Sequence, residues 1–223
     1  MRWVRDTTGR FPRRPHFEPQ ELDGECEELV AAFLQARYGR VHYPLDTDDL
    51  TVLVEEHAAE LDLYAELAEA GIEAETEFVQ GRRPRVRVDR RLSEQPRRAQ
   101  RLRATLAHEL GHVLFHNFLW FFERGYTPSC RRPPSVDWME WQAGYASGAL
   151  LVPRRALAEL VDDGPVCWER AAAGRALVKR VQAAFDVSAA LARVRLRQRG
   201  HLLARPPGLP PRGRRWPIRY AIS

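Results

Sequence analysis

Two histidines and a glutamate near the middle of the chain have the types and the spacing that metal-dependent hydrolysis requires. His108, Glu109 and His112 form H-E-x-x-H within the run RATLAHELGHVLFH. On an α-helix, residues four apart differ in direction by only about 40°, so the two imidazoles can share one metal ion at about 2.0–2.1 Å. Glu109 lies about 100° round the helix from His108, which suits a general base that acts on water without binding the metal. Gly111 would allow another backbone or a substrate to come close.

A catalytic zinc site typically has three protein ligands and one open position, so a third ligand is needed. The residues after His112 do not continue into H-x-x-G-x-x-H, and a later element must therefore supply it. Glu140, on the next predicted helix, is the best candidate. However, Asp137-x-x-Glu140 is also a good capping box, in which the glutamate bonds the start of its own helix. From the residues alone, both roles stay open for Glu140.

His116 and Tyr145 are weaker candidates for the same site. His116 lies about 80° from His108 around the helix, which favours packing or support of a ligand over direct metal binding. Either residue is a possible stabiliser of the oxyanion formed during hydrolysis. The alternative for the whole motif is a chance match whose histidines form hydrogen bonds in the core.

A long helix over about residues 95–116 must carry the motif. Leucines and a valine at spacings of three and four form its apolar stripe: Leu102, Leu106, Leu110, Val113 and Leu114. Further helices are predicted over about residues 22–38, 60–70, 166–185 and 188–199, with a short one capped by Asp46 or Thr47 and another from Asp137 to just before Pro153. Residues 72–79 and 85–89 read as two strands around a turn.

Composition indicates a protein with one main domain and short appendages. The chain has 223 residues, of which 44% are hydrophobic, and its first residues contain no apolar run typical of a secretory signal. The longest uncharged apolar stretch, residues 113–122, is far below the roughly 20 residues of a membrane span. The three cysteines, Cys26, Cys130 and Cys167, form no C-x-x-C pair and are read as reduced thiols. We therefore expect a cytoplasmic protein with no membrane partner.

The net charge of +5 invites a nucleic-acid interpretation. Lys179 is the only lysine, however, and abundant arginine, alanine and proline with scarce lysine indicate GC-rich codon usage instead. We do not expect direct nucleic-acid binding.

Two runs together resemble a known family. RATLAHELGHVLFH followed by E-x-x-A-x-x-x-x-G-A-L-L-V-P over residues 140–153 is similar to the ImmA/IrrE metallo-endopeptidases. The resemblance extends backward through YPLDTDDL and RPRVRVDRRL and forward to FDVSAALARVRLRQRG, covering about residues 40–200. H-E-x-x-H alone is shared with many zinc peptidases, and the combination with the second helix is much more specific.

The resemblance implies zinc held by His108, His112 and Glu140, with Glu109 as the catalytic base. It also implies an α+β, zincin-like fold, mainly helical, with a small antiparallel sheet beside the H-E-x-x-H helix. An edge strand of such a sheet can receive an extended peptide, and the strand over residues 85–89 is our candidate.

Members of this family typically cleave helix-turn-helix repressors. This chain has no obvious N-terminal repressor domain, so we expect a protein substrate that is a separately encoded repressor. We divide the chain into an N-terminal arm and helix (1–40), a zinc metallopeptidase core (41–155), a C-terminal helical part packed on the core (156–202) and a Pro/Arg-rich tail (203–223).

Two other functions remain as alternatives. The first is a DNA-binding regulator, because residues 177–194 have helix-turn-helix spacing and four arginines at alternate positions could contact phosphates: Arg193, Arg195, Arg197 and Arg199. Alternate residues spread around a helix rather than forming one face, which favours an ordinary helical hairpin. The second is a zinc sensor that retains the site without proteolysis.

Overall fold

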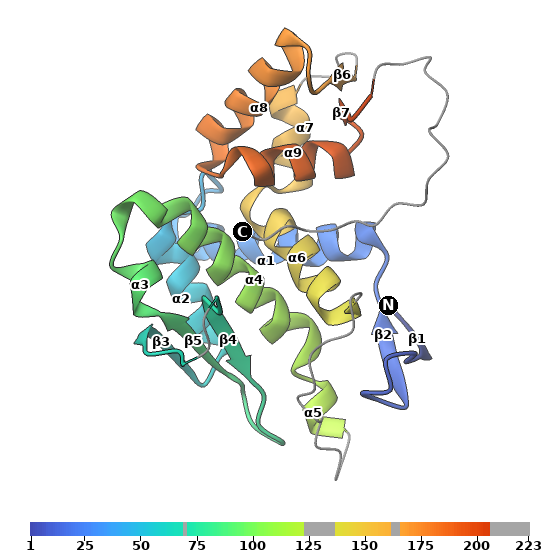
Figure 1. Ribbon diagram of the computed structural model, residues 1–223, viewed down its shortest axis with the longest axis vertical. Coiled ribbons are helices and arrows are strands. Elements are labelled where there is room, and N and C mark those ends of the chain that lie inside the picture. The colour runs from blue at the N-terminus through green and yellow to red at the C-terminus, as the bar shows by residue number, and fades with distance from the viewer. Residues whose placement is uncertain (69–70, 123–136, 162–165, 206–223) are drawn as a thin grey trace.

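The computed structural model describes residues 1–68, 71–122, 137–161 and 166–205, and helices dominate it (Figure 1). The helices are α1 (Pro19–Tyr38), α2 (Thr47–His57), α3 (Arg90–Ser93), the 3-10 turn η1 (Pro96–Arg98), α4 (Ala99–His116), α5 (Leu119–Phe122), α6 (Trp138–Leu151), α7 (Arg154–Val161), α8 (Ala172–Phe185) and α9 (Ala189–Gln198). The strands are β1 (Arg2–Arg5), β2 (Arg13–His16), β3 (Glu60–Ala65), β4 (Ala74–Glu77), β5 (Arg85–Asp89), β6 (Cys167–Trp168) and β7 (Leu202–Leu203). A helical protein with a small sheet against the H-E-x-x-H helix is the α+β, zincin-like fold that the sequence predicts.

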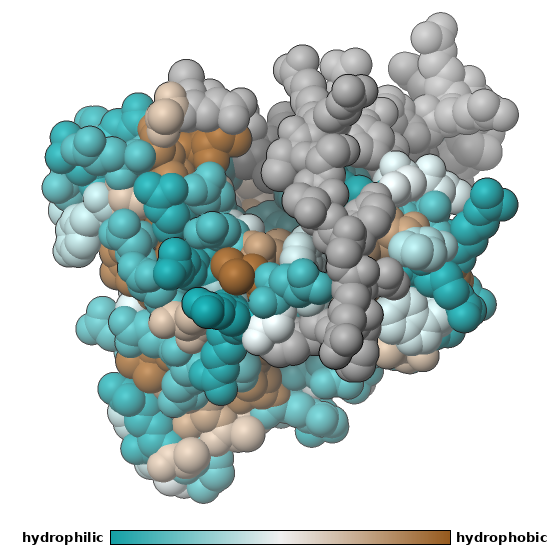
Figure 2. All heavy atoms as spheres, turned by 90° about the horizontal axis from the view of Figure 1, so that it is seen from below, coloured by the Kyte–Doolittle hydropathy of each residue, from teal (hydrophilic) through white to brown (hydrophobic). Residues whose placement is uncertain are grey.

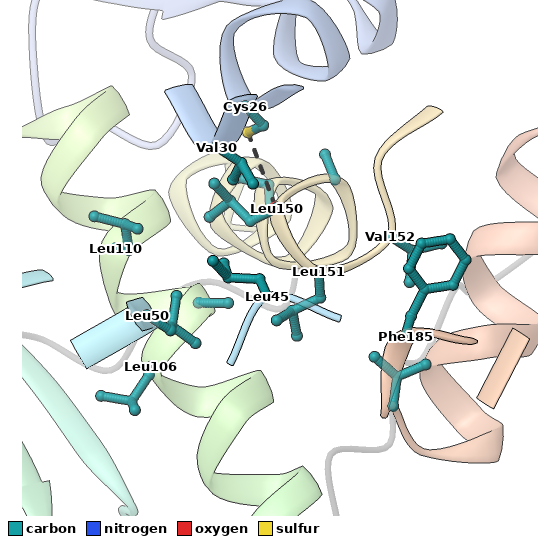
Figure 3. Packing of buried hydrophobic residues seen from close by; sticks show 14 of the residues in the cluster. Cys26, Val30, Leu45, Leu50, Leu106, Leu110, Leu150, Leu151, Val152 and Phe185 are labelled. Atoms are coloured by element: carbon teal, nitrogen blue, oxygen red, sulfur yellow. Dashed lines mark hydrogen bonds between the residues drawn. The ribbon is translucent and has the colours of Figure 1, made fainter. Parts of the chain in front are cut away.

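Helix α4 lies between the three-stranded sheet and α6 (Figure 1). The predicted apolar stripe is confirmed, because Leu106 and Leu110 are fully buried in the main core. In Figure 3 these two side chains face Leu50 of α2, and Leu150 of α6 lies beyond them. The helix that carries the motif is therefore packed on several sides, which holds its polar face in a fixed direction.

Cys26 of α1 belongs to the same core, and its thiol points to the carbonyl of Ala146 at 3.9 Å (Figure 3). Burial raises the pKa of this thiol far above its ordinary value. Cys26 and Cys167 are both free thiols, as the sequence predicts, and Cys130 lies outside the described residues.

The central sheet has the order β3-β5-β4, with β3 parallel and β4 antiparallel to β5. The two strands predicted around a turn are confirmed, but the helix predicted over residues 60–70 is wrong. Residues 60–65 form β3 instead, because Leu61 pairs with Val86 and extends the sheet. Helix-favouring alanine and glutamate are overridden there by tertiary pairing.

The expectation that residues 85–89 offer a free edge is also wrong. Both sides of β5 are already hydrogen-bonded, so it has no side left for a peptide. Among the described strands, β3 and β4 are the edges of this sheet.

The N-terminal arm that precedes the first helix has regular structure. β1 and β2 form an antiparallel hairpin, with Arg2 opposite His16. The hairpin loop reaches the start of α6, where Arg10 makes an ion pair with Asp137 at 2.5 Å and Phe11 packs edge-on against Trp138. The N-terminal segment is thus a structural part of the domain.

The C-terminal helices α7, α8 and α9 lie together at one end of the molecule (Figure 1). Helix α9 agrees with prediction, whereas α8 starts at Ala172 rather than near residue 166, because Cys167 and Trp168 pair with β7. Helix α7 was not predicted, since Pro153 was read as a stop; the proline carbonyl in fact accepts the first helical bond, from Leu157. Of the predicted tail, residues 206–223 lie outside the described part.

A buried ion network joins α9 to α1. Asp23, fully buried, pairs with Arg195 and also with Arg199 at 3.0 Å, and Tyr145 of α6 donates its hydroxyl to the same carboxylate at 3.0 Å. Removing one partner of a buried pair typically costs about 3–5 kcal/mol, so this network anchors the C-terminal helices firmly. The four-part division of the chain stays a prediction.

The molecular surface is mixed in character. In Figure 2 hydrophobic residues occur as separate groups among hydrophilic ones. Within the described residues, every helix is too short or too polar to cross a bilayer.

Candidate metal centre

Three side chains from α4 and α6 bring their donor atoms together as a metal site requires. The Nε2 atoms of His108 and His112 lie 3.1 Å apart, and the carboxylate of Glu140 lies 3.2 Å from the first and 3.3 Å from the second. Tetrahedral bonds of about 2.0–2.1 Å place ligand atoms roughly 3.3 Å from each other. The three residues therefore fit a zinc-sized ion with one position left for water or substrate.

A close helix crossing makes this meeting possible. Gly111 lies so near α6 that a Cβ there would stand 3.0 Å from the Cα of Ala143 and 3.1 Å from the Cβ of Ala146. The sequence predicted that this glycine allows another backbone to approach, and that is confirmed. Without a side chain at Gly111, α6 comes close enough for Glu140 to reach both histidines.

Glu140 uses its carboxylate for this cluster, and the cap of α6 is made by another residue. Asp137 accepts the hydrogen bond from the Met139 amide at 2.9 Å. Burial would raise the pKa of Glu140, but hydrogen bonds from His108 and His112 hold it well below its ordinary value. The side chain is 52% exposed, so the cluster is open to solvent on this side.

His116 stands directly behind His112. Their Nδ1 atoms are 3.0 Å apart, the His116 Nε2 is 3.0 Å from the Gln142 Oε1, and the Gln142 amide donates to the Pro15 carbonyl at 3.1 Å. Burial, reinforced by the neighbouring His112, lowers the pKa of His116 well below its usual value, so His116 stays neutral.

The hydrogen bonds that link Pro15, Gln142, His116 and His112 determine which ring nitrogen of each histidine carries the proton. The Pro15 carbonyl only accepts, so Gln142 presents its NH2 group to Pro15 and its oxygen to His116. His116 must then carry its proton on Nε2 and accept at Nδ1. Neutral His112 consequently donates from Nδ1, which leaves the lone pair of its Nε2 directed at the cluster.

The pKa of His112 is set by burial and by the carboxylates around it. Burial acts to lower the pKa of His112, but the hydrogen bond to Glu140 and the negative charges of Glu109 and Glu140 outweigh it, and the net effect raises that pKa. A positive charge is therefore favoured at this position, as it is in a site for a cation.

Glu109 lies off the ligand side, as its helix position predicts, and is buried. The Thr76 hydroxyl of β4 donates to its Oε2 at 2.6 Å. This bond is short and holds the carboxylate against the edge strand of the sheet.

Tyr145 is placed differently from the expectation for an oxyanion stabiliser. Its hydroxyl donates to Asp23 and its ring lies under the Arg195 guanidinium at 5.5 Å. The structure thus gives it a part in the buried ion network.

The arginines that suggested phosphate binding are mostly engaged inside the protein. Arg195 and Arg199 pair with Asp23, and Arg197 pairs with Glu169. The α8–α9 pair is a packed hairpin with its turn at Asp186, in the left-handed conformation. This placement removes the main support for a DNA-binding regulator.

Three residues at the site were not identified from the sequence: Thr76, Gln142 and Pro15. Each lies on a different element, and nothing in its own spacing relates it to H-E-x-x-H. Pro15 in addition belongs to the N-terminal hairpin, which no motif linked to the site.

Comparison with known proteins agrees with the geometry. No curated protein matches the chain. The family model described as the IrrE N-terminal-like domain, of peptidase family M78, matches residues 59–197. This range contains the H-E-x-x-H helix and Glu140, and it confirms the resemblance to the ImmA/IrrE proteins. The chain therefore belongs to the family of the IrrE N-terminal-like domain.

Proposed function

We propose that the chain is a zinc-dependent endopeptidase that hydrolyses a peptide bond in a specific transcriptional repressor or another regulatory protein. His108, His112 and Glu140 hold the ion, and Glu109 is the catalytic base. The observation that carries the proposal is the set of donor distances of 3.1–3.3 Å among these three side chains, which are spaced like the corners of a zinc tetrahedron. Membership of a peptidase family supports hydrolysis of a protein substrate.

Zinc, when bound, supplies a Lewis acid that polarises the peptide carbonyl and makes a water molecule acidic near neutral pH. Glu109 takes the proton of the attacking water and returns it to the leaving amine. Thr76 fixes the orientation of Glu109 for both transfers. His116 and Gln142 hold the imidazole of His112 in the tautomer that leaves Nε2 free.

The substrate peptide is proposed to run along β4. This strand is an edge of the described sheet, and its Thr76 contacts the catalytic base. An extended peptide added to β4 by main-chain hydrogen bonds would pass Glu109 without unfolding any part of the protein. The cytoplasmic location that we propose is supported by the free thiols Cys26 and Cys167.

Co-expression with repressors encoded beside the gene tests the proposal. Intact-mass analysis of each repressor is expected to reveal cleavage at one peptide bond with the wild-type chain and none with the Glu109→Gln chain. A chain that binds zinc and leaves every neighbouring repressor intact would instead favour the zinc-sensor alternative.

A further inference from the structure

A second group of metal-ligand side chains lies between the end of α1 and the start of α2. His42, Asp46 and Asp49 each have a ligand atom within 4.8 Å of those of the other two. They precede residue 59, where the match to the family model begins, and none of them belongs to the H-E-x-x-H centre. We propose that these three residues form a second site for a divalent transition-metal ion such as Zn²⁺.

Asp49 provides the strongest argument. Its side chain is only 2% exposed, and the Oδ1 atom is satisfied by the Tyr38 hydroxyl at 2.8 Å and the Arg37 Nε at 3.0 Å. Its Oδ2 atom is buried and has no hydrogen-bond partner. A buried carboxylate oxygen without a partner costs free energy, and a cation beside it removes that cost.

His42 also has a buried polar atom without a hydrogen-bond partner, its Nδ1. The imidazole packs edge-on against the Tyr38 ring at 5.0 Å between centroids, which fixes its plane. Tyr38 thus orients both ligands, by its ring at His42 and by its hydroxyl at Asp49, as residues behind metal ligands do.

Asp46 completes the set from the solvent side. It is the N-cap residue of α2, yet its carboxylate makes no cap hydrogen bond. Aspartate at this position ordinarily accepts from the first turn of the helix, so the free carboxylate is available to an ion. Asp46 is exposed, and an ion can therefore enter from solvent and keep water as a further ligand.

The charges and atom types favour a transition metal over Ca²⁺ or Mg²⁺. One imidazole nitrogen and two carboxylate oxygens are ligands that Zn²⁺ accepts, whereas Ca²⁺ and Mg²⁺ require oxygen ligands throughout. The guanidinium of Arg37 engages only the Oδ1 atom of Asp49, which leaves the buried Oδ2 atom for the ion. Bound there, the ion holds the connection between α1 and α2 against the first turn of α2.

Zinc stoichiometry of the full-length chain tests the inference. After metal removal and dialysis to equilibrium against Zn²⁺, elemental analysis is expected to give two ions for the wild type, one for His42→Ala, one for His108→Ala and none for the double variant. Asp46→Asn provides a second variant at an exposed position, with the same expected loss of one ion. The matched controls are Asp48→Asn, an aspartate in the first turn of α2 that is not one of the proposed ligands, and His57→Ala at the end of α2. Both controls are expected to keep two zinc ions.

The double variant also supports a stability measurement. Zn²⁺ is expected to raise the melting temperature of the His108→Ala chain and to leave that of the His42→Ala/His108→Ala chain unchanged. If water rather than metal fills the space, His42→Ala and Asp46→Asn will bind as much zinc as the wild type, and the inference is overturned. Loss of an ion in His42→Ala but not in His108→Ala would support this site while contradicting the proposed catalytic one.

Discussion

The Nδ1 atom of His112 lies 3.0 Å from the Nδ1 atom of His116, inside the core and one turn apart on α4. This contact makes His112, a proposed zinc ligand, the first member of a chain of hydrogen bonds that ends at the Pro15 carbonyl. The orientation of His112 is therefore set by a backbone group of the N-terminal hairpin, almost a hundred residues away in sequence.

Gln142→Leu is expected to weaken zinc binding by about 10–100-fold, because partners behind a ligand contribute that much to metal affinity. Leucine fills a similar volume but leaves the His116 Nε2 without its acceptor. Competition with a chromophoric chelator measures the affinity. The control is Gln35→Leu, an exposed glutamine on α1, and equal zinc affinity in both variants would contradict the role assigned to Gln142.

Glu140→Gln is expected to reduce zinc affinity by on the order of 100-fold or more, beyond the effect of a residue behind a ligand. Asp137→Ala is the informative comparison, because Asp137 makes the cap of α6 and the ion pair with Arg10. It is expected to lower the free energy of unfolding by about 1 kcal/mol or more while zinc affinity changes far less. If Glu140→Gln lowers the free energy of unfolding and leaves zinc affinity unchanged, Glu140 belongs to the cap of α6 instead.

Glu109→Gln is expected to lower proteolysis by at least about 10²-fold with zinc content and folding retained, because glutamine keeps the size of the side chain but accepts no proton. Cleavage of the cognate repressor, followed at equal zinc loading, gives the rate. Glu28→Gln, an exposed glutamate on α1 rather than on the strand proposed to bind the peptide, is the matched control and should cleave normally. Wild-type cleavage by the Glu109 variant would end its assignment as the base.

Gly111→Ala is expected to destabilise the protein by about 1–3 kcal/mol, since the added methyl group forces α4 and α6 apart. The same displacement moves Glu140 from the histidines, so zinc affinity falls too. Gly144→Ala on α6 is the control: a Cβ there meets nothing within 4 Å, and alanine in a helix should stabilise by up to about 1 kcal/mol. Denaturant unfolding measures both changes, and an unaltered Gly111→Ala protein would refute the tight crossing.

Asp89 gives a pH dependence whose sign follows from its partners. The Arg91 side chain, by its hydrogen bond, holds the pKa of Asp89 at about 2, below the ordinary value of 3.8. A depressed pKa means that this carboxylate stabilises the fold fully above about pH 4 and loses its effect as the pH falls toward about 2. The stability difference between the wild type and Asp89→Asn should therefore shrink through that interval. A difference that stays constant would show that the charge of Asp89 does not matter.

Much of the fold and of the candidate site could be predicted from local sequence. Apolar spacing located α4, because Leu106 and Leu110 follow the period of a helix and enter the core. H-E-x-x-H placed two imidazoles on one side of that helix, since the geometry of four residues is the same in every α-helix. Residues 60–65 were misread because helix-favouring composition cannot report a parallel partner more than twenty residues ahead.

The sequence by itself determined the chemical groups of the centre and the helix that carries two of them, since both depend on contacts within four residues. Only the tertiary structure decided where the Glu140 carboxylate lies, because its distance from the two histidines depends on where α6 crosses α4, and that crossing depends on the absence of a side chain at Gly111. It alone also brought Thr76 to Glu109 and Pro15 to Gln142. Such contacts join segments far apart in the chain, and packing of the whole core, rather than any local pattern, sets their distance.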